Sequence, residues 1–451
     1  MFTADTCQSC HVLQGIEAWP EDVGTTLEGQ YAQPHRPPPL EFLWTRAGVE
    51  GFHNIGQDCT TCHEPVGGVA PTFADLHNGY DDHIYDAAGQ KYSDLNTVSV
   101  DAVTRSGDLL TVNFTATNPE ISPTLAISFY GWDTKHYIVP AHERDGNGID
   151  CPHSSRPGCN IEWTPGSTKP FFTEDPASVA GDWMVTFDMS LFQAVKTDPI
   201  PQLITDGAVK FAEITILPRL VVGTADVVLE AVSTSYDLGG SLIVEDYFQG
   251  ANASVDIEKC NACHDTLGST FHAGRGRGGD SMQTCKVCHS TTFPGGHIEM
   301  ASRSIDSYVH AIHSFQPFDE DDVAADDDPV FNARNAQHKN HVFPYFTALA
   351  CEGCHLPGTY NAPDQSKSMP GVVSASWDIE DRSIGTVPEY VTGPASRACG
   401  ACHRANMIID DRAGDLASFN AHTDAFGTLE ENDDEDLILF GIIDKIMSMF
   451  E

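Results

Sequence analysis

The chain has 451 residues and carries 65 acidic side chains against 24 basic ones, which gives a formal net charge of -41. This length allows two or three domains. So strong a negative charge excludes nucleic acid as a partner, because the phosphate backbone would be repelled, and it is typical of a solvated acidic surface.

The N-terminal segment, residues 1–90, contains two copies of the pattern Cys-x-x-Cys-His. This pattern is a c-type haem attachment signal: two thiols bind one haem covalently, and the following histidine is placed under the iron. Zinc sites also use Cys-x-x-Cys pairs, but they do not require a histidine directly after each pair. We therefore predict a dihaem segment, with haem bound by Cys7, Cys10, Cys59 and Cys62 and proximal ligands His11 and His63.

Residues 91–248 lack the pattern and look different. Short runs rich in Val, Ile, Thr and aromatic residues alternate with turn residues, which predicts an antiparallel β-sandwich or barrel of about seven strands. The runs are Thr97–Val100, Leu110–Thr115, Leu125–Tyr130, Trp183–Met189, Ala208–Leu217, Val227–Ser233 and Ser241–Phe248.

Two cysteines of this domain, Cys151 and Cys159, are outside the haem motifs. Their spacing in a segment rich in Pro, Gly and Ser suits a short loop closed by a disulfide. Covalent haem attachment and a disulfide both indicate an exported protein. No export signal precedes Cys7, so we expect a processed or truncated chain, or a misplaced start codon.

Residues 249–428 hold four more motifs in irregular sequence with few short helices, and we predict a tetrahaem domain. One expected helix is Ser304–Phe315. The acidic run from Asp319 to Asp328 offers oxygen ligands for calcium but lacks a regular ligand spacing, so a solvated turn is the favoured interpretation. The attachment cysteines are Cys260, Cys263, Cys285, Cys288, Cys351, Cys354, Cys399 and Cys402, and the proximal ligands are His264, His289, His355 and His403.

Residues 429–451 form an acidic and then apolar tail, for which we predict a short helix with carboxylates at its N-terminus. The apolar run Leu437–Phe450 is too short to cross a membrane and contains Asp444 and Lys445. We therefore expect no transmembrane span.

Fourteen of the 20 histidines lie outside the motifs, more than enough to give each of six irons a second imidazole. Such ligation implies lower potentials than a Met/His pair. We predict distal ligands among His77, His83, His272, His310, His313 and His422, with His35, His53, His297, His338 and His341 in reserve. His136, His142 and His153 of the strand-rich domain are expected to be structural, although any of them could approach a haem at the domain boundary.

Several of these stretches resemble the OmcA/MtrC family of outer-membrane multihaem cytochromes. The resemblance covers most of residues 90–427 and is strongest in the last 180 of them. It is carried by Lys259–His264, Phe271–Gly274, Cys285–His289, Val309–His313, Phe343-Pro344 before Cys351–His355, and Ala401–His403 with the later His422, while Phe211–Leu217 is similar to the strand entering the family's haem domain.

The resemblance implies extracellular electron transfer, split β-barrel domains alternating with multihaem domains, and distal roles for His272, His310, His313 and His422. It also implies a close cysteine pair in the β-domain, as at Cys151 and Cys159. Well-known members carry ten haems in two five-haem domains, whereas this chain has six motifs arranged as two and four around one strand-rich domain.

Three functions are compatible with these observations. In the first, six haems relay electrons at the cell surface to another redox protein, a flavin or an insoluble acceptor. In the second, the chain is a subunit of a cytochrome filament. In the third, one iron lacks a distal ligand and the chain is a terminal reductase. The first is favoured because histidines are abundant and no catalytic constellation stands out.

Overall fold

The structure of the chain is a computed structural model. It describes the strand-rich domain and parts of the haem-motif region: residues 83–131, 136–142, 160–175, 179–194, 198–244, 254–264, 278–279, 282–290, 304–306, 309–310, 351–359, 371–373, 390–392 and 429–431.

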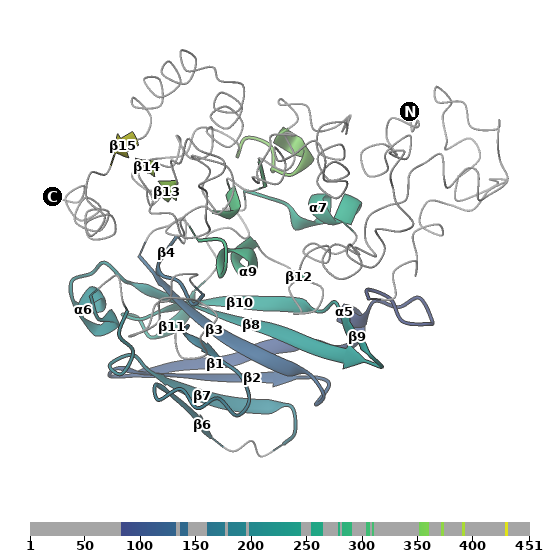
Figure 1. Cartoon of the computed structure of the whole chain (residues 1–451), viewed down its shortest axis with the longest axis horizontal. Helices are drawn as coiled ribbons and strands as arrows, with labels where there is room; N and C mark the ends of the chain where they lie inside the picture. Colours follow the sequence, from purple (N-terminus) through teal and green to yellow (C-terminus); the bar gives the residue numbers. More distant parts are fainter. Residues whose placement is uncertain are drawn as a thin grey trace, which may run out of the picture.

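The strand-rich domain is built from two antiparallel sheets packed face to face (Figure 1). The smaller sheet has the order β1-β2-β7-β6, formed by Val98–Ser106, Leu109–Ala116, Asp182–Asp188 and Phe172–Asp175. The larger sheet has the order β11-β10-β8-β3-β4, formed by Leu242–Val244, Glu230–Asp237, Phe211–Val222, Ser122–Tyr130 and Tyr137–Val139. In the described residues no strand of one sheet is hydrogen bonded to the other, so the predicted sandwich is confirmed and the domain is not a closed barrel.

Three short strands extend the larger sheet. β5 (Glu162–Trp163) pairs with β3, and β9 (Ala225–Val227) pairs with β8. The third, β12 (Gly278–Gly279), comes from the haem-motif region and pairs in parallel with β10. A segment of the predicted tetrahaem domain is thereby hydrogen bonded to the sandwich.

Alternating side chains of the strands fill the space between the sheets. On β3, Leu125, Ile127 and Phe129 are fully buried in this core, as the period of two requires. Phe187 of β7 lies at the centre of an aromatic cluster, with its ring centroid 5.2 to 6.1 Å from those of Phe129, Phe171, Phe172 and Phe192.

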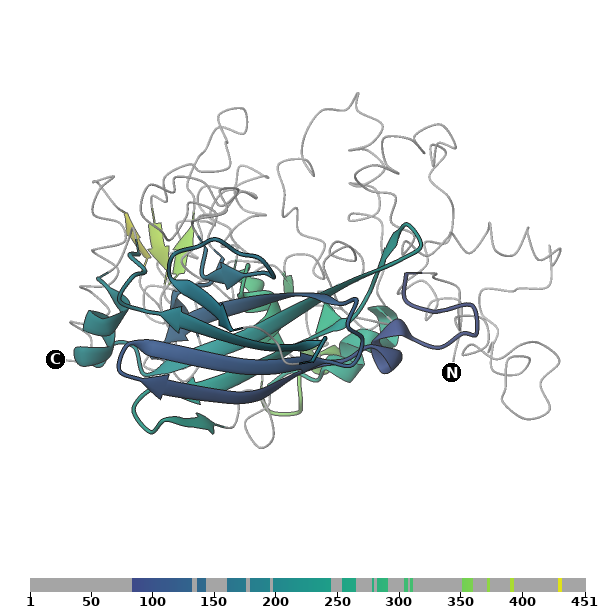
Figure 2. The same ribbon diagram turned by 90° about the horizontal axis from the view of Figure 1, so that it is seen from below.

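The other face of the larger sheet is also buried, although it is polar. Glu213 of β8 is fully buried, and its two carboxylate oxygens accept hydrogen bonds of 2.5 Å from the hydroxyls of Ser233 and Ser235. The Tyr130 hydroxyl in turn donates to Ser235 at 2.9 Å. These bonds give the buried polar atoms partners. In Figure 1 the larger sheet lies between the smaller sheet and the described parts of the haem-motif region, and in Figure 2, seen from below, the two sheets overlap.

The predicted strands correspond to β1, β2, β3, β7, β8 and β11, while the run Val227–Ser233 spans the break between β9 and β10. Sequence patterning missed β4, β5 and β6 (each two to four residues long) and the helices α5 (Tyr92–Leu95) and α6 (Ile200–Thr205), which are too short to show a period. The sandwich also includes residues before 91: Ile84 is buried, and the His83 carbonyl accepts a hydrogen bond from the Val228 amide.

The described haem-motif region contains the helices α7 (Ile257–His264) and α9 (Met282–Lys286), the short 3-10 helix η5 (Cys351–Gly353) and a small antiparallel sheet. That sheet has the order β13-β14-β15, formed by Gly371–Val373, Tyr390–Thr392 and Leu429–Glu431. The first three residues of the predicted tail helix are therefore a strand, and the remainder lies outside the described residues. In the predicted helix Ser304–Phe315, the backbone is helical at Ile305, Asp306, Val309 and His310.

No helix within the described residues is long and apolar enough to span a membrane.

The aromatic cluster should govern the stability of the sandwich. Replacing Phe187 by Ala is expected to lower the free energy of unfolding by about 3–5 kcal/mol, because it removes a fully buried ring and leaves a cavity. Chemical denaturation followed by tryptophan fluorescence measures the change, since Trp163 is buried in the same core. The control is Met184→Ala on the same strand, whose side chain is exposed. Equal losses from both variants would contradict this account of the core.

Candidate haem-binding site

Three of the six motifs lie in described residues, and each of them is one turn of helix. In the motif at Cys351, the amides of Cys354 and His355 both donate to the Cys351 carbonyl, at 3.2 and 2.9 Å. The amides of Cys288 and His289 donate to the Cys285 carbonyl in the same way, at 3.2 and 3.0 Å. The motif at Cys260 lies within α7. Because residues three and four apart share one face of a helix, such a turn presents two thiols and an imidazole on one side.

Backbone pairing joins the motif at Cys260 to the motif at Cys351. Val255 and His355 form an antiparallel bridge. The Asp256 amide donates to the Cys354 carbonyl at 2.9 Å, and the Leu356 amide donates to the Ser254 carbonyl at 3.1 Å. Two attachment segments that are more than 80 residues apart in the sequence are therefore in direct contact.

A lysine reinforces this contact. The Lys259 ammonium donates hydrogen bonds to the carbonyl oxygens of Glu352 and His355, each at 2.9 Å. Basic side chains are favourable at such turn ends, where carbonyl groups lack helical partners. Lys259 thus connects α7 to the turn at Cys351, which carries the predicted proximal ligand His355.

The thiols of the two motifs also meet. A hydrogen bond with the Cys354 side chain raises the pKa of the Cys260 thiol, and burial and the nearby charges of Cys354 and Asp256 raise it further. The Cys260 Sγ atom lies 3.6 Å from the Asp256 carbonyl oxygen. The Cys260 side chain is therefore a protonated thiol at neutral pH.

The imidazole rings of His310 and His355 lie close together and are nearly parallel. Their centroids are 6.1 Å apart and their planes are inclined by only 15°. Two imidazoles that ligate one iron from opposite sides, each at about 2 Å, have centroids roughly 6 Å apart. The centroid separation of His310 and His355 therefore equals that of two imidazoles on one iron.

The surroundings of His355 also suit a ligand. Burial lowers the pKa of His355, and the neighbouring His310 and Lys259 lower it further, while a hydrogen bond with the Ser254 backbone opposes the shift. A lowered pKa keeps the imidazole neutral at physiological pH, and only a neutral imidazole can ligate a metal.

The motif at Cys285 is fixed on the sandwich. Val287, between its two cysteines, is buried against Ala126 of β3 and Ala141, and Cys288 packs on the same three residues. Ala126 belongs to the polar face of the larger sheet, where its small side chain leaves space for the motif. Burial raises the pKa of the Cys285 thiol, while the Thr284 hydroxyl and the Lys286 charge act in the opposite direction.

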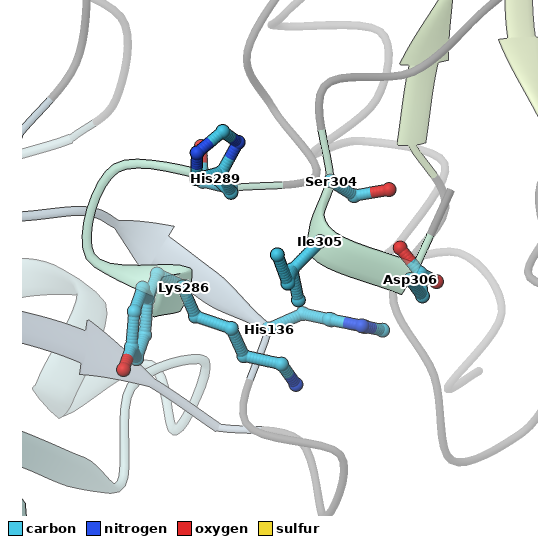
Figure 3. A pocket seen from close by; sticks show the side chains of 8 residues that line it. His136, Lys286, His289, Ser304, Ile305 and Asp306 are labelled. Atoms are coloured by element: carbon cyan, nitrogen blue, oxygen red, sulfur yellow. The ribbon is translucent and has the colours of Figure 1, made fainter. Parts of the chain in front are cut away.

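Beside this motif is a pocket at the boundary between the sandwich and the haem-motif region (Figure 3). The predicted proximal ligand His289 lines it together with His136, which precedes β4 of the sandwich and is buried. The full lining is His136, Tyr137, Lys286, His289, Ser290, Ser304, Ile305 and Asp306. His136 was expected to be structural, although it could approach a haem at the domain boundary; it lies at that boundary, in the pocket that His289 also lines.

Two further histidines are held by hydrogen bonds in the sandwich. His83 Nδ1 lies 2.7 Å from the Asp226 carbonyl oxygen, so this nitrogen donates and the tautomer keeps its lone pair on Nε2, as in many metal-ligating histidines. His142 Nδ1 lies 3.0 Å from a Glu162 carboxylate oxygen and 2.9 Å from the Asn160 amide. His142 therefore has a structural environment, as expected.

The remaining predicted site residues lie outside the described residues, or their side chains do. This holds for Cys7, Cys10, His11, Cys59, Cys62, His63, Cys263, His264, Cys399, Cys402 and His403, for the distal candidates His77, His272, His313 and His422, for the reserves His35, His53, His297, His338 and His341, for His153, and for Cys151 and Cys159. The acidic run from Asp319 to Asp328 also lies there, so its calcium interpretation stays a prediction.

Sequence reasoning missed Lys259 as a site residue. The lysine directly precedes a motif, but nothing in the local pattern shows that its ammonium reaches the turn at Cys351. Its partners are backbone carbonyls, which are present at every residue and carry no sequence signal.

Comparison with known proteins agrees with the motifs. Residues 252–436 match the family model described as outer membrane cytochrome MtrC/MtrF-like, domains II/IV. Among solved structures, MtrC from Shewanella baltica OS185 is 16% identical, over 71% of this chain and 45% of its own, with a TM-score of 0.29. The decahaem cytochrome OmcA is 14% identical, over 48% of this chain and 32% of its own, also with a TM-score of 0.29. No curated protein sequence matches the chain.

The chain spans less than half the length of either solved structure. Attachment turns with paired thiols and an imidazole, together with this match, define a c-type cytochrome. Residues 252–436 are similar to domains II/IV of the MtrC/MtrF-like outer-membrane cytochromes, in agreement with the predicted family and with haem as the cofactor. The number of six haems stays a prediction.

The contact of Val287 with the sandwich can be tested directly. Replacing Val287 by Asp places a carboxylate without a partner against Ala126 and Ala141, at a cost of about 3 kcal/mol, and is expected to detach the segment from the sheet. Hydrogen exchange should then become faster both at residues 284–290 and in β3. In the control Val221→Asp, the same charge is added at an exposed position of β8, and exchange at residues 284–290 should not change. Unchanged exchange in Val287→Asp would contradict the docking.

Proposed function

We propose that this protein is an extracellular electron-transfer protein that carries electrons through six covalently bound c-type haems, most of them ligated by two histidines. The observation that carries the proposal is the pair His310 and His355, whose ring centroids are spaced as those of two ligands of one iron. An iron with two protein ligands has no open position for a substrate. This chemistry favours a carrier over a catalyst.

The described residues supply several of the ligands in this proposal. His355 and His289 are proximal ligands at the turns of Cys351 and Cys285, and His310 is the distal ligand opposite His355. His83 remains a distal candidate because the Asp226 carbonyl fixes its tautomer. For the other motif histidines the proximal role, and for the other candidates the distal role, rests on the sequence pattern alone.

The placement of the attachment turns supports a relay. Haem supplies reversible one-electron chemistry at each turn. The strand pairing between residues 254–256 and 354–356 holds two of the turns together, and Cys285 is close enough to Cys260 to contribute to the shift of its pKa. The chain itself therefore attaches the haems covalently, ligates their irons and holds them close together.

The partners that suit this chemistry are other redox proteins or insoluble acceptors outside the cell. A net charge of -41 keeps the chain soluble and favours partners with a basic surface. The filament and reductase alternatives differ in assembly and in iron ligation. Electron microscopy at high protein concentration tests the first, and spectroscopy tests the second.

The cofactor content and the ligation are open to one combined measurement. Mass spectrometry of the purified protein should show the mass of six covalently attached haems. Low-temperature EPR of the oxidised protein should show low-spin iron only, and the reduced protein should not bind carbon monoxide, because both axial positions are occupied. A high-spin, carbon-monoxide-binding haem would instead favour the reductase.

The assignment of His310 predicts a specific change. In His310→Met, one haem should acquire Met/His ligation, and its potential should rise because a thioether stabilises the reduced iron. A potentiometric titration followed by absorption should show one shifted component and the others unchanged. The matched control is His142→Met, whose imidazole is bonded to Glu162 and Asn160. A titration curve of His310→Met identical to that of the unaltered protein would remove His310 from the ligands.

A further inference from the structure

Lys259 places a positive charge inside the haem-binding region of a strongly acidic chain. The side chain is half-buried, and its ammonium donates to the carbonyl oxygens of Glu352 and His355. These oxygens are neutral, so the two hydrogen bonds hold the ammonium in place without cancelling its charge. Only 24 of the 451 residues are Lys or Arg, so Lys259 is one of few positive charges in the chain.

The position of the charge is fixed from two sides. Lys259 belongs to α7, and the segment just before it pairs with the backbone of residues 354–356. The Thr359 hydroxyl adds a further bond to the Ser254 carbonyl at 2.7 Å. These contacts hold the backbone of Lys259 beside the turn at Cys351, and the two hydrogen bonds of the ammonium hold its side chain there.

From this geometry we propose that Lys259 raises the reduction potential of the haem bound by Cys351, Cys354 and His355. The inference rests on the proposed function, since it requires a haem at this turn. It goes further by assigning a tuning role to a residue that neither binds the haem covalently nor ligates the iron.

The physical argument concerns charge alone. An iron centre loses one positive charge when it is reduced, so a nearby fixed cation favours the reduced state. The charge is close to this site, because the Lys259 ammonium donates to the carbonyl oxygen of His355 itself at 2.9 Å. The half-buried position reduces screening by water and salt.

The test compares three substitutions of Lys259. Lys259→Gln keeps hydrogen-bond donors and removes the charge, Lys259→Met removes both, and Lys259→Arg keeps both. The control Lys210→Gln makes the same change in net charge on an exposed lysine of the sandwich. Redox titrations of the holoproteins, followed by absorption and EPR, are combined with haem content by mass spectrometry.

In Lys259→Gln and Lys259→Met, one haem should shift to a more negative potential. At a fixed poise, its ratio of oxidised to reduced form should rise about threefold, which corresponds to ~28 mV for a one-electron centre. Lys259→Arg and Lys210→Gln should leave every potential unchanged. If the role of Lys259 were only structural, the haem potentials of Lys259→Gln would not shift as long as that variant keeps its haems.

Two results would overturn the inference: unchanged potentials in both Lys259→Gln and Lys259→Met, or an equal shift in Lys210→Gln. Should Lys259→Gln lose a haem, Lys259→Arg decides, because a negative shift in a variant that keeps the charge contradicts an effect of charge. Failure of the proposed function has a different signature, since the unaltered protein would then lack a low-spin haem at this turn.

Discussion

The described part of the haem region depends on the backbone pairing between residues 254–256 and 354–356. A haem motif is only five residues long, and one turn of helix cannot bury a core or fix its own position. The antiparallel bridge between Val255 and His355 supplies the missing constraint, because its hydrogen bonds are made by main-chain atoms on both sides. The bridge also determines which residues become neighbours. Cys260 meets Cys354, and Lys259 reaches the carbonyl oxygens of the Cys351 turn.

The second constraint is the polar face of the larger sheet. An antiparallel sheet can leave one face in water, and the residues of that face are then polar. Here Ser128, Glu213, Thr215 and Ser235 have that polar character but are buried. Hydrogen bonds from Ser233, Ser235 and Tyr130 satisfy the buried groups, and Ala126 leaves room for Val287. The sandwich is therefore a base for the motif at Cys285 as well as a folded domain in its own right.

Electrostatics in this protein operate at two scales. The large negative charge of the whole chain acts at long range on solubility and on the choice of partner, and it is screened by salt. Single charges within the haem region act at short range and are screened less. Lys259 beside the Cys351 turn and Lys286 beside the Cys285 thiol are such charges. Under the proposed function, such local charges give the haems of one acidic chain different potentials.

The sequence by itself determined the chemistry and the class of the sandwich. The Cys-x-x-Cys-His spacing is local, so the attachment residues and proximal histidines could be predicted without a fold, and the alternation along Leu125–Tyr130 was enough to predict a strand. The short strands β4, β5 and β6 lacked such a period. Only the tertiary structure decided that His310 lies near His355, that His136 and His289 line one pocket, and that Lys259 reaches the Cys351 turn. The physical reason is that these contacts join residues far apart in the chain, several of them through backbone atoms that are the same at every position.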